Sequence, residues 1–115
     1  MKLRAWDKED EEYITWEQLI RIPYNQFFYR QTDPSAPILS ILTDPHLTLE
    51  QWTGLYDKNG TEIYEGDILR GGLLNEDCTV FYHETNGYYV AQGEHYKVFA
   101  HKFWQFEVVG NIHQK

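Results

Sequence analysis

The clearest pattern along the chain is an alternation of apolar and polar positions that short glycine-containing segments interrupt. Near the middle, Leu47 to Gln51 predicts the end of a strand, Asp57 to Gly60 predicts a tight turn, and Ile63 to Leu69 resumes extended apolar character. The Asn-Gly pair of this turn tolerates the positive φ that tight hairpin turns require. Gly66 interrupts the second apolar run, and it predicts a bulge or a sharp bend there.

The second half of the chain repeats the period-2 pattern in shorter segments. Cys78, Val80 and Tyr82 alternate with Thr79, Phe81 and His83, which is typical of a half-buried strand. Around that strand we expect a loop over Gly71 to Asp77, a hairpin turn at Asn86-Gly87, and strands over Tyr88 to Ala91, Tyr96 to Phe99 and Phe106 to Ile112.

The first third of the chain predicts a strand, a charged turn and one short helix. Met1 to Asp7 alternates as a strand, and the run Asp7 to Glu12 is expected to be a solvated turn. Thr15 and Gln18 fit a capping box, after which Trp16, Leu19 and Ile20 form one apolar stripe that ends before Pro23. Beyond it we expect a strand at Asn25 to Arg30 and a loop over residues 32–37, and we leave Ile38 to Leu42 unassigned.

These elements predict a mainly β protein with minor α content. Short strands at intervals of roughly 8–12 residues with glycine turns are typical of a small antiparallel barrel or sandwich. A chain of 115 residues has the usual size of one domain. We therefore expect a single domain over residues 1–115, with an N-terminal strand, helix and variable segment over 1–45 and a β-barrel part over 46–115.

Three segments of the sequence resemble the YopX family of small bacteriophage and prophage proteins. The central segment from Trp52 to Leu69 is WTGLYDKNGTEIYEGDIL, and Trp52 stands where the family more often has tyrosine. Arg4 to Lys8 resembles the opening of the family pattern, and Glu107 to Ile112 resembles its closing strand. Because the three segments occur in the right order, the resemblance covers nearly the whole chain.

The resemblance implies a mainly β structure with an SH3-like barrel and a phage or prophage context. It implies no catalytic residues, because the family has no settled biochemical activity. We expect the most recognisable motif positions to serve backbone geometry and packing, although a binding role for the motif stays open. These positions are Gly54, Asn59, Gly60, Gly66 and Asp67.

Charge and composition narrow the classes of function. The net charge of −8 argues against a protein that holds duplex DNA, since that mode needs a basic face. The sequence contains no apolar run long enough for a membrane span and no signal-peptide pattern at its start, so we expect a cytosolic protein. Cys78 is the only cysteine, which excludes an internal disulfide and favours a small buried side chain.

Candidate catalytic and metal-binding groups form no recognised motif. Glu62, Glu65 and Asp67 lie near the predicted bend and could form an acid and base pair or hold magnesium, whereas an Asp after Gly commonly accepts turn amides. The histidines have no recognised ligand spacing, so an enzyme is a minor alternative and we expect no metal or cofactor. They are His46, His83, His95, His101 and His113.

Aromatic side chains make up 17% of the sequence, more than one small core needs. We expect some of them to form a partner-binding surface, with Trp52, Tyr64, Tyr88, Tyr89 and Trp104 as the candidates. The favoured function is a non-enzymatic interaction protein that binds a host or phage protein and that could form a homo-oligomer. The alternative is a protein that binds single-stranded nucleic acid or assists its processing, because exposed rings can also stack on bases.

Overall fold

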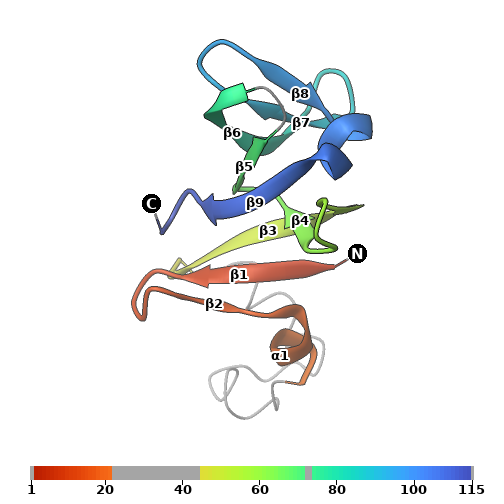
Figure 1. The fold of residues 1–115 in the computed structure, drawn as a ribbon. Coiled ribbons are helices and arrows are strands. Elements are labelled where there is room, and N and C mark those ends of the chain that lie inside the picture. The colour runs from red at the N-terminus through yellow and green to blue at the C-terminus, as the bar shows by residue number, and fades with distance from the viewer. Residues whose placement is uncertain (1, 22–44, 72–73, 115) are drawn as a thin grey trace. The chain divides into compact units, whose positions relative to one another are not determined.

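The structure is a computed structural model, and it describes residues 2–21, 45–71 and 74–114 (Figure 1). The chain divides into two compact units, Met1–Glu50 and Gln51–Lys115, which are described separately below. The elements are β1 (Leu3–Asp7), β2 (Glu12–Ile14), α1 (Trp16–Arg21), β3 (Leu47–Tyr56), β4 (Glu62–Tyr64), β5 (Asp67–Gly71), β6 (Leu74–His83), β7 (Tyr88–Gln92), β8 (Lys97–Phe99), the 3₁₀ helix η1 (Ala100–Gln105) and β9 (Phe106–Asn111).

The first unit contains an antiparallel hairpin of β1 and β2. The predicted first strand is confirmed, and the charged run forms the turn that follows it, in which the Asp7 carboxylate accepts hydrogen bonds from the amides of Glu9 (2.9 Å) and Asp10 (3.2 Å). The strand β2 was not predicted. Its three residues are too few for an alternation to be recognised, and Tyr13 becomes a strand residue through its pairing with Trp6.

The short helix α1 begins at the capping box that the sequence predicts. The Gln18 amide donates to the Thr15 hydroxyl (3.2 Å), and the Thr15 amide donates to the side-chain oxygen of Gln18 (2.8 Å). Leu19 in the apolar stripe is buried. The predicted strand at 25–30, the loop at 32–37 and the unassigned segment at 38–42 lie outside the described residues.

The central hairpin consists of β3 and β4, joined by the predicted turn. Trp52 is paired with Tyr64 and Leu55 with Ile63, and the register shifts between these two pairs. Gly54 lies in this shift with a φ of 83°, a conformation that favours glycine. Gly66 then separates β4 from β5, which confirms the bend that the sequence predicts at this position.

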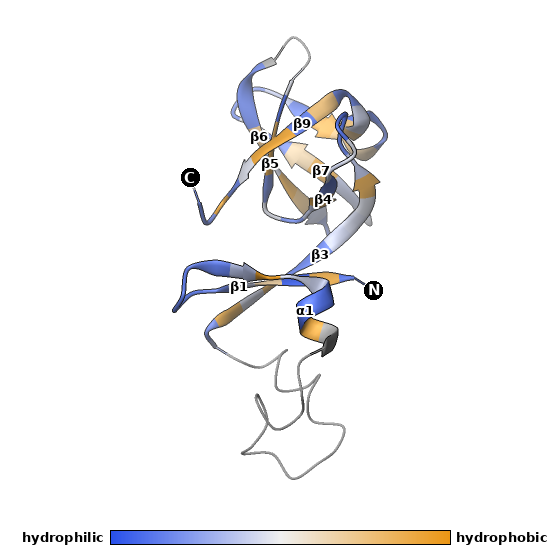
Figure 2. Ribbon diagram, turned by 60° about the horizontal axis from the view of Figure 1, so that its bottom comes forward, coloured by the Kyte–Doolittle hydropathy of each residue, from blue (hydrophilic) through white to orange (hydrophobic). Residues whose placement is uncertain are grey.

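The second unit is built on an antiparallel sheet of order β8-β7-β6-β5-β9, which is strongly curled (Figure 1). β5 pairs with β6 on one side and with β9 on the other, so the closing strand lies beside the strand in which the central motif ends. The concave side holds the core, and several of the buried strands are orange in the hydropathy colouring (Figure 2). The core residues are Ile63, Leu69, Cys78, Val80, Ala91, Val98, Phe103 and Phe106.

Two expectations about the second half are wrong. Residues 74–77, which we assigned to a loop, form the start of strand β6. Leu74 is paired with Gly71 of β5, so the pairing of the two strands includes the polar residues that follow Leu74. The aromatic segment before the last strand forms the 3₁₀ helix η1, so the described chain has two short helices where the sequence predicted one. Phe103 of η1 is fully buried, and burial of this ring anchors the turn in the core.

The mainly β class is confirmed, as two antiparallel sheets with little helix. The SH3-like barrel stays a prediction. Within the described ranges, neither helix has the length and apolar character that crossing a membrane requires.

Candidate interaction surface

The outer face of β6, β7 and β8 carries a row of aromatic rings, which we call the aromatic ladder. It consists of Phe81 and His83 on β6, Tyr88 on β7, Phe99 on β8 and His101 on η1. Successive ring centres lie 6.3, 5.5, 5.9 and 6.4 Å apart in that order, and the pairs are tilted, stacked, edge-on and stacked. The distances place each ring in contact with the next.

Strand register explains why these rings lie together. Val90 is paired with Phe81 on one side and with Phe99 on the other, and His83 is paired with Tyr88 in the next row. Val90 is fully buried although it lies on the outer face, while Phe81 and Phe99 are 38% and 44% exposed. The ladder therefore covers one valine and leaves much of its own apolar surface in water.

The aromatic residues singled out in the sequence occupy different environments. Tyr88 belongs to the ladder, and Trp104 on η1 is 63% exposed. Tyr89 packs against the core, where burial and the charge of Glu65 raise the pKa of its phenol. Trp52 is half-buried, donates to the Leu55 carbonyl (3.2 Å), and has its ring beside Tyr56.

Tyr64 is buried, so its ring offers little surface to a partner. Phe81, which is 38% exposed in the ladder, was not among the candidates. The signal for Phe81 was present in the sequence, because it alternates with the buried residues Cys78 and Val80 and must therefore lie on the opposite face.

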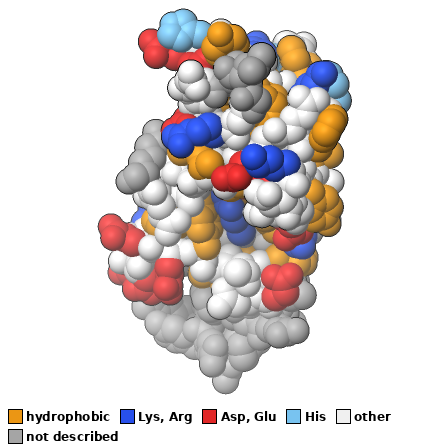
Figure 3. Space-filling view, viewed as in Figure 1, with side chains coloured by type: hydrophobic (Ala, Val, Ile, Leu, Met, Phe, Trp, Pro, Cys, Tyr) orange, Lys and Arg blue, Asp and Glu red, His pale blue; other side chains and the backbone are white. Residues whose placement is uncertain are grey.

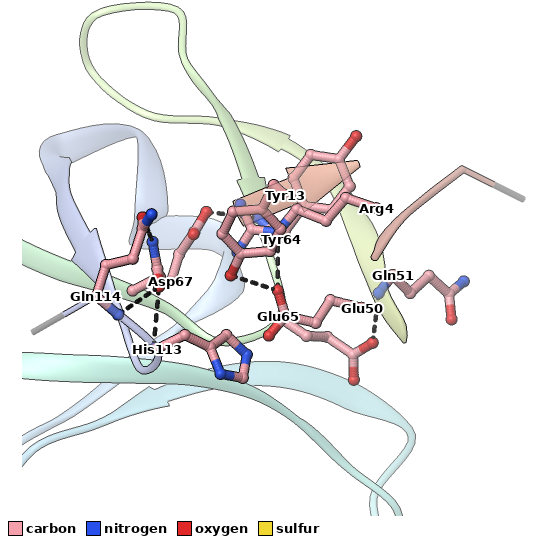
Figure 4. A network of polar contacts seen from close by, with 10 residues as sticks. Arg4, Tyr13, Glu50, Gln51, Tyr64, Glu65, Asp67, His113 and Gln114 are labelled. Atoms are coloured by element: carbon pink, nitrogen blue, oxygen red, sulfur yellow. Dashed lines mark hydrogen bonds and ion pairs between the residues drawn. The ribbon is translucent and has the colours of Figure 1, made fainter. Parts of the chain in front are cut away.

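The glycines of the central motif occupy turns that require positive φ. Gly60 and Gly66 have φ values of 82° and 85°, a region that other residues enter only at a cost in free energy. Beside them, the buried Asp67 carboxylate accepts a hydrogen bond from the Tyr64 amide (2.9 Å, Figure 4). Asn59 donates through its side chain to the Glu107 carboxylate (3.2 Å).

Asp57 is the residue of the central motif that sequence reasoning missed. Its buried carboxylate accepts hydrogen bonds from the amides of Asn59 (2.8 Å) and Thr61 (2.9 Å) within the turn. It also accepts from the amide of Val108 on β9 (2.9 Å). Burial acts to raise the pKa of Asp57, but the three amides, with the charge of Lys58, outweigh it and hold the pKa below its ordinary value.

Further backbone hydrogen bonds tie the central motif to the closing segment of the chain. The Lys58 amide donates to the Phe106 carbonyl (2.9 Å), and the Ile112 amide donates to the Gly66 carbonyl (2.9 Å). The side-chain oxygen of Asn111 then accepts hydrogen bonds from the backbone amides of His113 and Gln114, both at 3.0 Å. Two segments of the chain that resemble the family pattern are therefore hydrogen-bonded to each other within the second unit.

Two of the three candidate carboxylates, those of Glu65 and Asp67, accept hydrogen bonds from the backbone. Glu65 accepts from the Gln51 amide (2.7 Å, Figure 4) and returns a hydrogen bond from its own amide to the Gln51 carbonyl (3.0 Å). In the first unit, buried Glu50 accepts from Arg4 and from the Tyr13 hydroxyl, both at 2.8 Å. The Arg4 guanidinium also lies 4.1 Å from the centre of the Tyr13 ring.

The histidines are spread over the described chain. His83 and His101 belong to the ladder. The backbone carbonyl of His46 accepts a hydrogen bond from the Lys8 amide, and the backbone amide of His113 donates one to the Asn111 side chain. His95 shares the one group of at least three metal-ligating side chains found among the described residues, in which its donor atoms and those of Glu76 and Glu94 all lie within 4.8 Å of one another.

The Glu76 carboxylate already has a structural role. It accepts hydrogen bonds from the backbone amides of Glu94 (2.9 Å) and His95 (3.1 Å), and it therefore clamps the turn between β7 and β8. A side chain on Gly93 would meet Glu76, Cys78 and the chain backbone at 3.0–3.2 Å, so the clamp also depends on a glycine. Buried Cys78, whose pKa is raised first by burial and then by nearby carboxylates, is a packed thiol as predicted.

A shallow hollow lies beside the aromatic ladder, between β8, η1 and the start of β9. Phe99 and Tyr96 supply exposed rings to it, and Lys97 and Lys102 supply positive charge. The residues that line this hollow include no carboxylate: they are Tyr96, Lys97, Val98, Phe99, His101, Lys102, Gln105 and Phe106.

The fold and this surface define a small, mainly β protein in which an internally bonded turn motif supports a curled sheet with exposed aromatic rings. The chain belongs to the YopX family, because the family model "YopX protein" matches residues 2–115. It is also similar to the crystal structure of protein EF1440 from Enterococcus faecalis, with a TM-score of 0.56, 22% identity, and coverage of 97% of this chain and 92% of that chain. That likeness shows a common fold. A search of curated proteins finds no match.

Proposed function

We propose that this chain is a non-enzymatic interaction protein of phage or prophage origin that binds a host or phage protein in the bacterial cytosol. The observation that carries the proposal is the aromatic ladder, whose Phe81 and Phe99 rings are 38% and 44% exposed on a regular sheet face. Rings of this kind supply large contact areas at low conformational cost and dominate the energetics of many interfaces.

The form of the ladder suits a partner that lays apolar side chains across three neighbouring strands. Each ring touches the next, so the rings hold one another in place and lose little side-chain freedom on binding. Truncating one central ring of such a surface weakens binding by roughly fivefold or more, which corresponds to about 1 kcal/mol.

The test is affinity capture from bacterial host lysate, with and without nuclease, read by mass spectrometry. The parent chain is compared with Phe81→Ser/Tyr88→Ser, and with Tyr56→Ser as the control, since Tyr56 is an exposed ring that belongs to β3 and lies outside the ladder. We expect a protein that resists nuclease, is retained by the control and is lost with the ladder variant. Equal capture by all three folded chains would refute the role of the ladder.

Binding of single-stranded nucleic acid is the second candidate. The observation that favours it is the stretch from His95 to Gln105, which has no acidic residue, two lysines and several rings. It predicts that a labelled oligothymidylate binds at low salt and dissociates as salt is raised. No change in fluorescence anisotropy at low salt would remove this candidate.

The finer fold assignment, an SH3-like barrel, belongs to the same proposal. The curl of the second sheet and the position of η1 between β8 and β9 support it. Absence of a catalytic role is part of the proposal too, because the buried carboxylates of Asp67 and Asp57 already accept hydrogen bonds from backbone amides.

A further inference from the structure

The hollow between β8 and η1 carries positive charge that the described chain leaves unpaired. Lys97 and Lys102 both line it, and neither makes an ion pair with any residue in the described part of the chain. This is unusual in a protein whose net charge is −8. Phe99 and Tyr96 add exposed apolar surface beside the two ammonium groups.

The turn between β1 and β2, which we call the acidic turn, carries the opposite excess. It has the sequence DKEDEE from Asp7 to Glu12, and Lys8 to Glu12 are exposed. The Asp7 carboxylate is used within the turn, while the carboxylates from Glu9 to Glu12 make no ion pair with any described residue. Figure 2 colours this turn blue, and Figure 3 shows red side chains gathered where Figure 1 places it.

We propose that the acidic turn of one copy of the chain docks in the lysine-lined hollow of a second copy. The two surfaces are complementary in charge, and each is formed on regular structure: the acidic turn joins the two strands of a hairpin, and the hollow lies between β8 and η1. Tyr96 and Phe99 provide an apolar floor against which the aliphatic parts of the turn side chains pack.

This contact joins two different surfaces, so it is a heterologous interface. Each copy keeps one acidic turn and one hollow available, and the assembly grows head to tail until it closes as a ring or is limited by concentration. Because exposed ion pairs contribute little individually and are screened by salt, the association is weak and decreases as ionic strength rises. The hollow shares Phe99 and His101 with the aromatic ladder, but its two lysines lie outside the ladder, and the proposal assigns the hollow to self-association.

The test is analytical ultracentrifugation of the full chain over a wide concentration range at low and high salt. We compare the parent with Lys97→Glu/Lys102→Glu, which reverses the hollow, and with Glu9→Lys/Asp10→Lys, which reverses the turn. Each variant alone is expected to show an apparent dissociation constant at least about tenfold higher than the parent. An equimolar mixture of the two associates again, because each then meets a surface of opposite charge. The control Glu84→Lys, an exposed change on the β6–β7 turn, leaves association unchanged.

Restored association in the mixture supports the proposal in a way that a general effect of net charge cannot imitate. A parent chain that stays monomeric at every concentration overturns it, as does a mixture that behaves as two monomers. Binding of oligothymidylate that depends on Lys97 and Lys102, in a chain that remains monomeric, also overturns it and assigns the hollow to nucleic acid. All these variants keep Phe81 and Tyr88, so failure here is distinct from failure of the capture experiment.

Discussion

Replacing Asp57 by alanine tests whether one carboxylate connects the central turn to the closing strand. Asp57 is 5% exposed, and its carboxylate accepts hydrogen bonds from the backbone amides of Asn59, Thr61 and Val108 at 2.8–2.9 Å. Hydrogen bonds to a charged group each contribute about 1.5–3 kcal/mol. In the alanine variant the two turn amides can bond to water instead, which offsets part of the loss, so we expect the free energy of unfolding to fall by about 3–4 kcal/mol. That is a large part of the roughly 5–15 kcal/mol that stabilises a typical domain.

The conservative variant Asp57→Asn separates the two halves of this role. Its carbonyl oxygen can still accept the two turn amides, but its NH₂ group then faces the Val108 amide, donor against donor. We therefore expect about half of the alanine effect, or roughly 2 kcal/mol. The control is Asp77→Asn, which breaks an exposed ion pair with Arg70 and is expected to change stability by no more than about 0.5 kcal/mol.

The assay is urea unfolding followed by tryptophan fluorescence, with hydrogen exchange at the Val108 amide as a local measurement. Since the pKa of Asp57 is lowered in the folded chain, its contribution is present above the ordinary value of 3.8 and is lost as pH falls through the folded-state pKa. The stability difference between parent and Asp57→Asn is thus constant at neutral pH and narrows only under acid conditions. An alanine variant within about 1 kcal/mol of the parent would refute this account, since even one lost charged hydrogen bond exceeds that.

Three further predictions concern other parts of the chain. Glu50→Gln removes the charge that pairs with half-buried Arg4, and we expect chemical denaturation to show a loss of about 2 kcal/mol or more. Gly93→Ala places a methyl group 3.0 Å from Glu76 and from Cys78, so we expect a loss of about 1–3 kcal/mol in thermal unfolding. Because burial raises the pKa of the Cys78 thiol, its reaction with a thiol reagent at neutral pH should follow unfolding, and rapid labelling of the folded chain would contradict this.

The parts of the fold that the sequence predicts are those set by local chemistry. The capping box of Thr15 and Gln18 specifies its own hydrogen bonds, and Gly66 specifies a bend because few other residues adopt its φ. The alternation from Cys78 to His83 likewise predicts which side chains lie inside, since side-chain direction in a strand has period 2.

The parts that escaped prediction depend on residues distant in sequence. Leu74 begins a strand because it pairs with Gly71 on β5. The polar residues that follow have no intrinsic preference for β structure strong enough to reveal the strand in the sequence. The aromatic ladder needs the registers of β6, β7 and β8 together, which no local pattern fixes. Asp57 was missed for the same reason: a turn Asp is common, but its hydrogen bond to Val108 spans 51 residues.

The polar atoms of the family motif bear on whether that motif is a binding site or a scaffold. The carboxylates of Asp57 and Asp67 accept hydrogen bonds from backbone amides. The Asn59 side chain donates to Glu107, and the Gly66 carbonyl accepts a hydrogen bond from the Ile112 amide, all within the second unit. A recognition motif would be expected to direct such groups toward solvent, whereas these groups close turns and hold the last strand. The exposed rings lie instead on β6 to η1, mostly outside the motif. We therefore infer that the motif maintains the fold and that partner recognition depends on the ladder, so substitutions at Asp57 should alter stability while those at Phe81 alter binding.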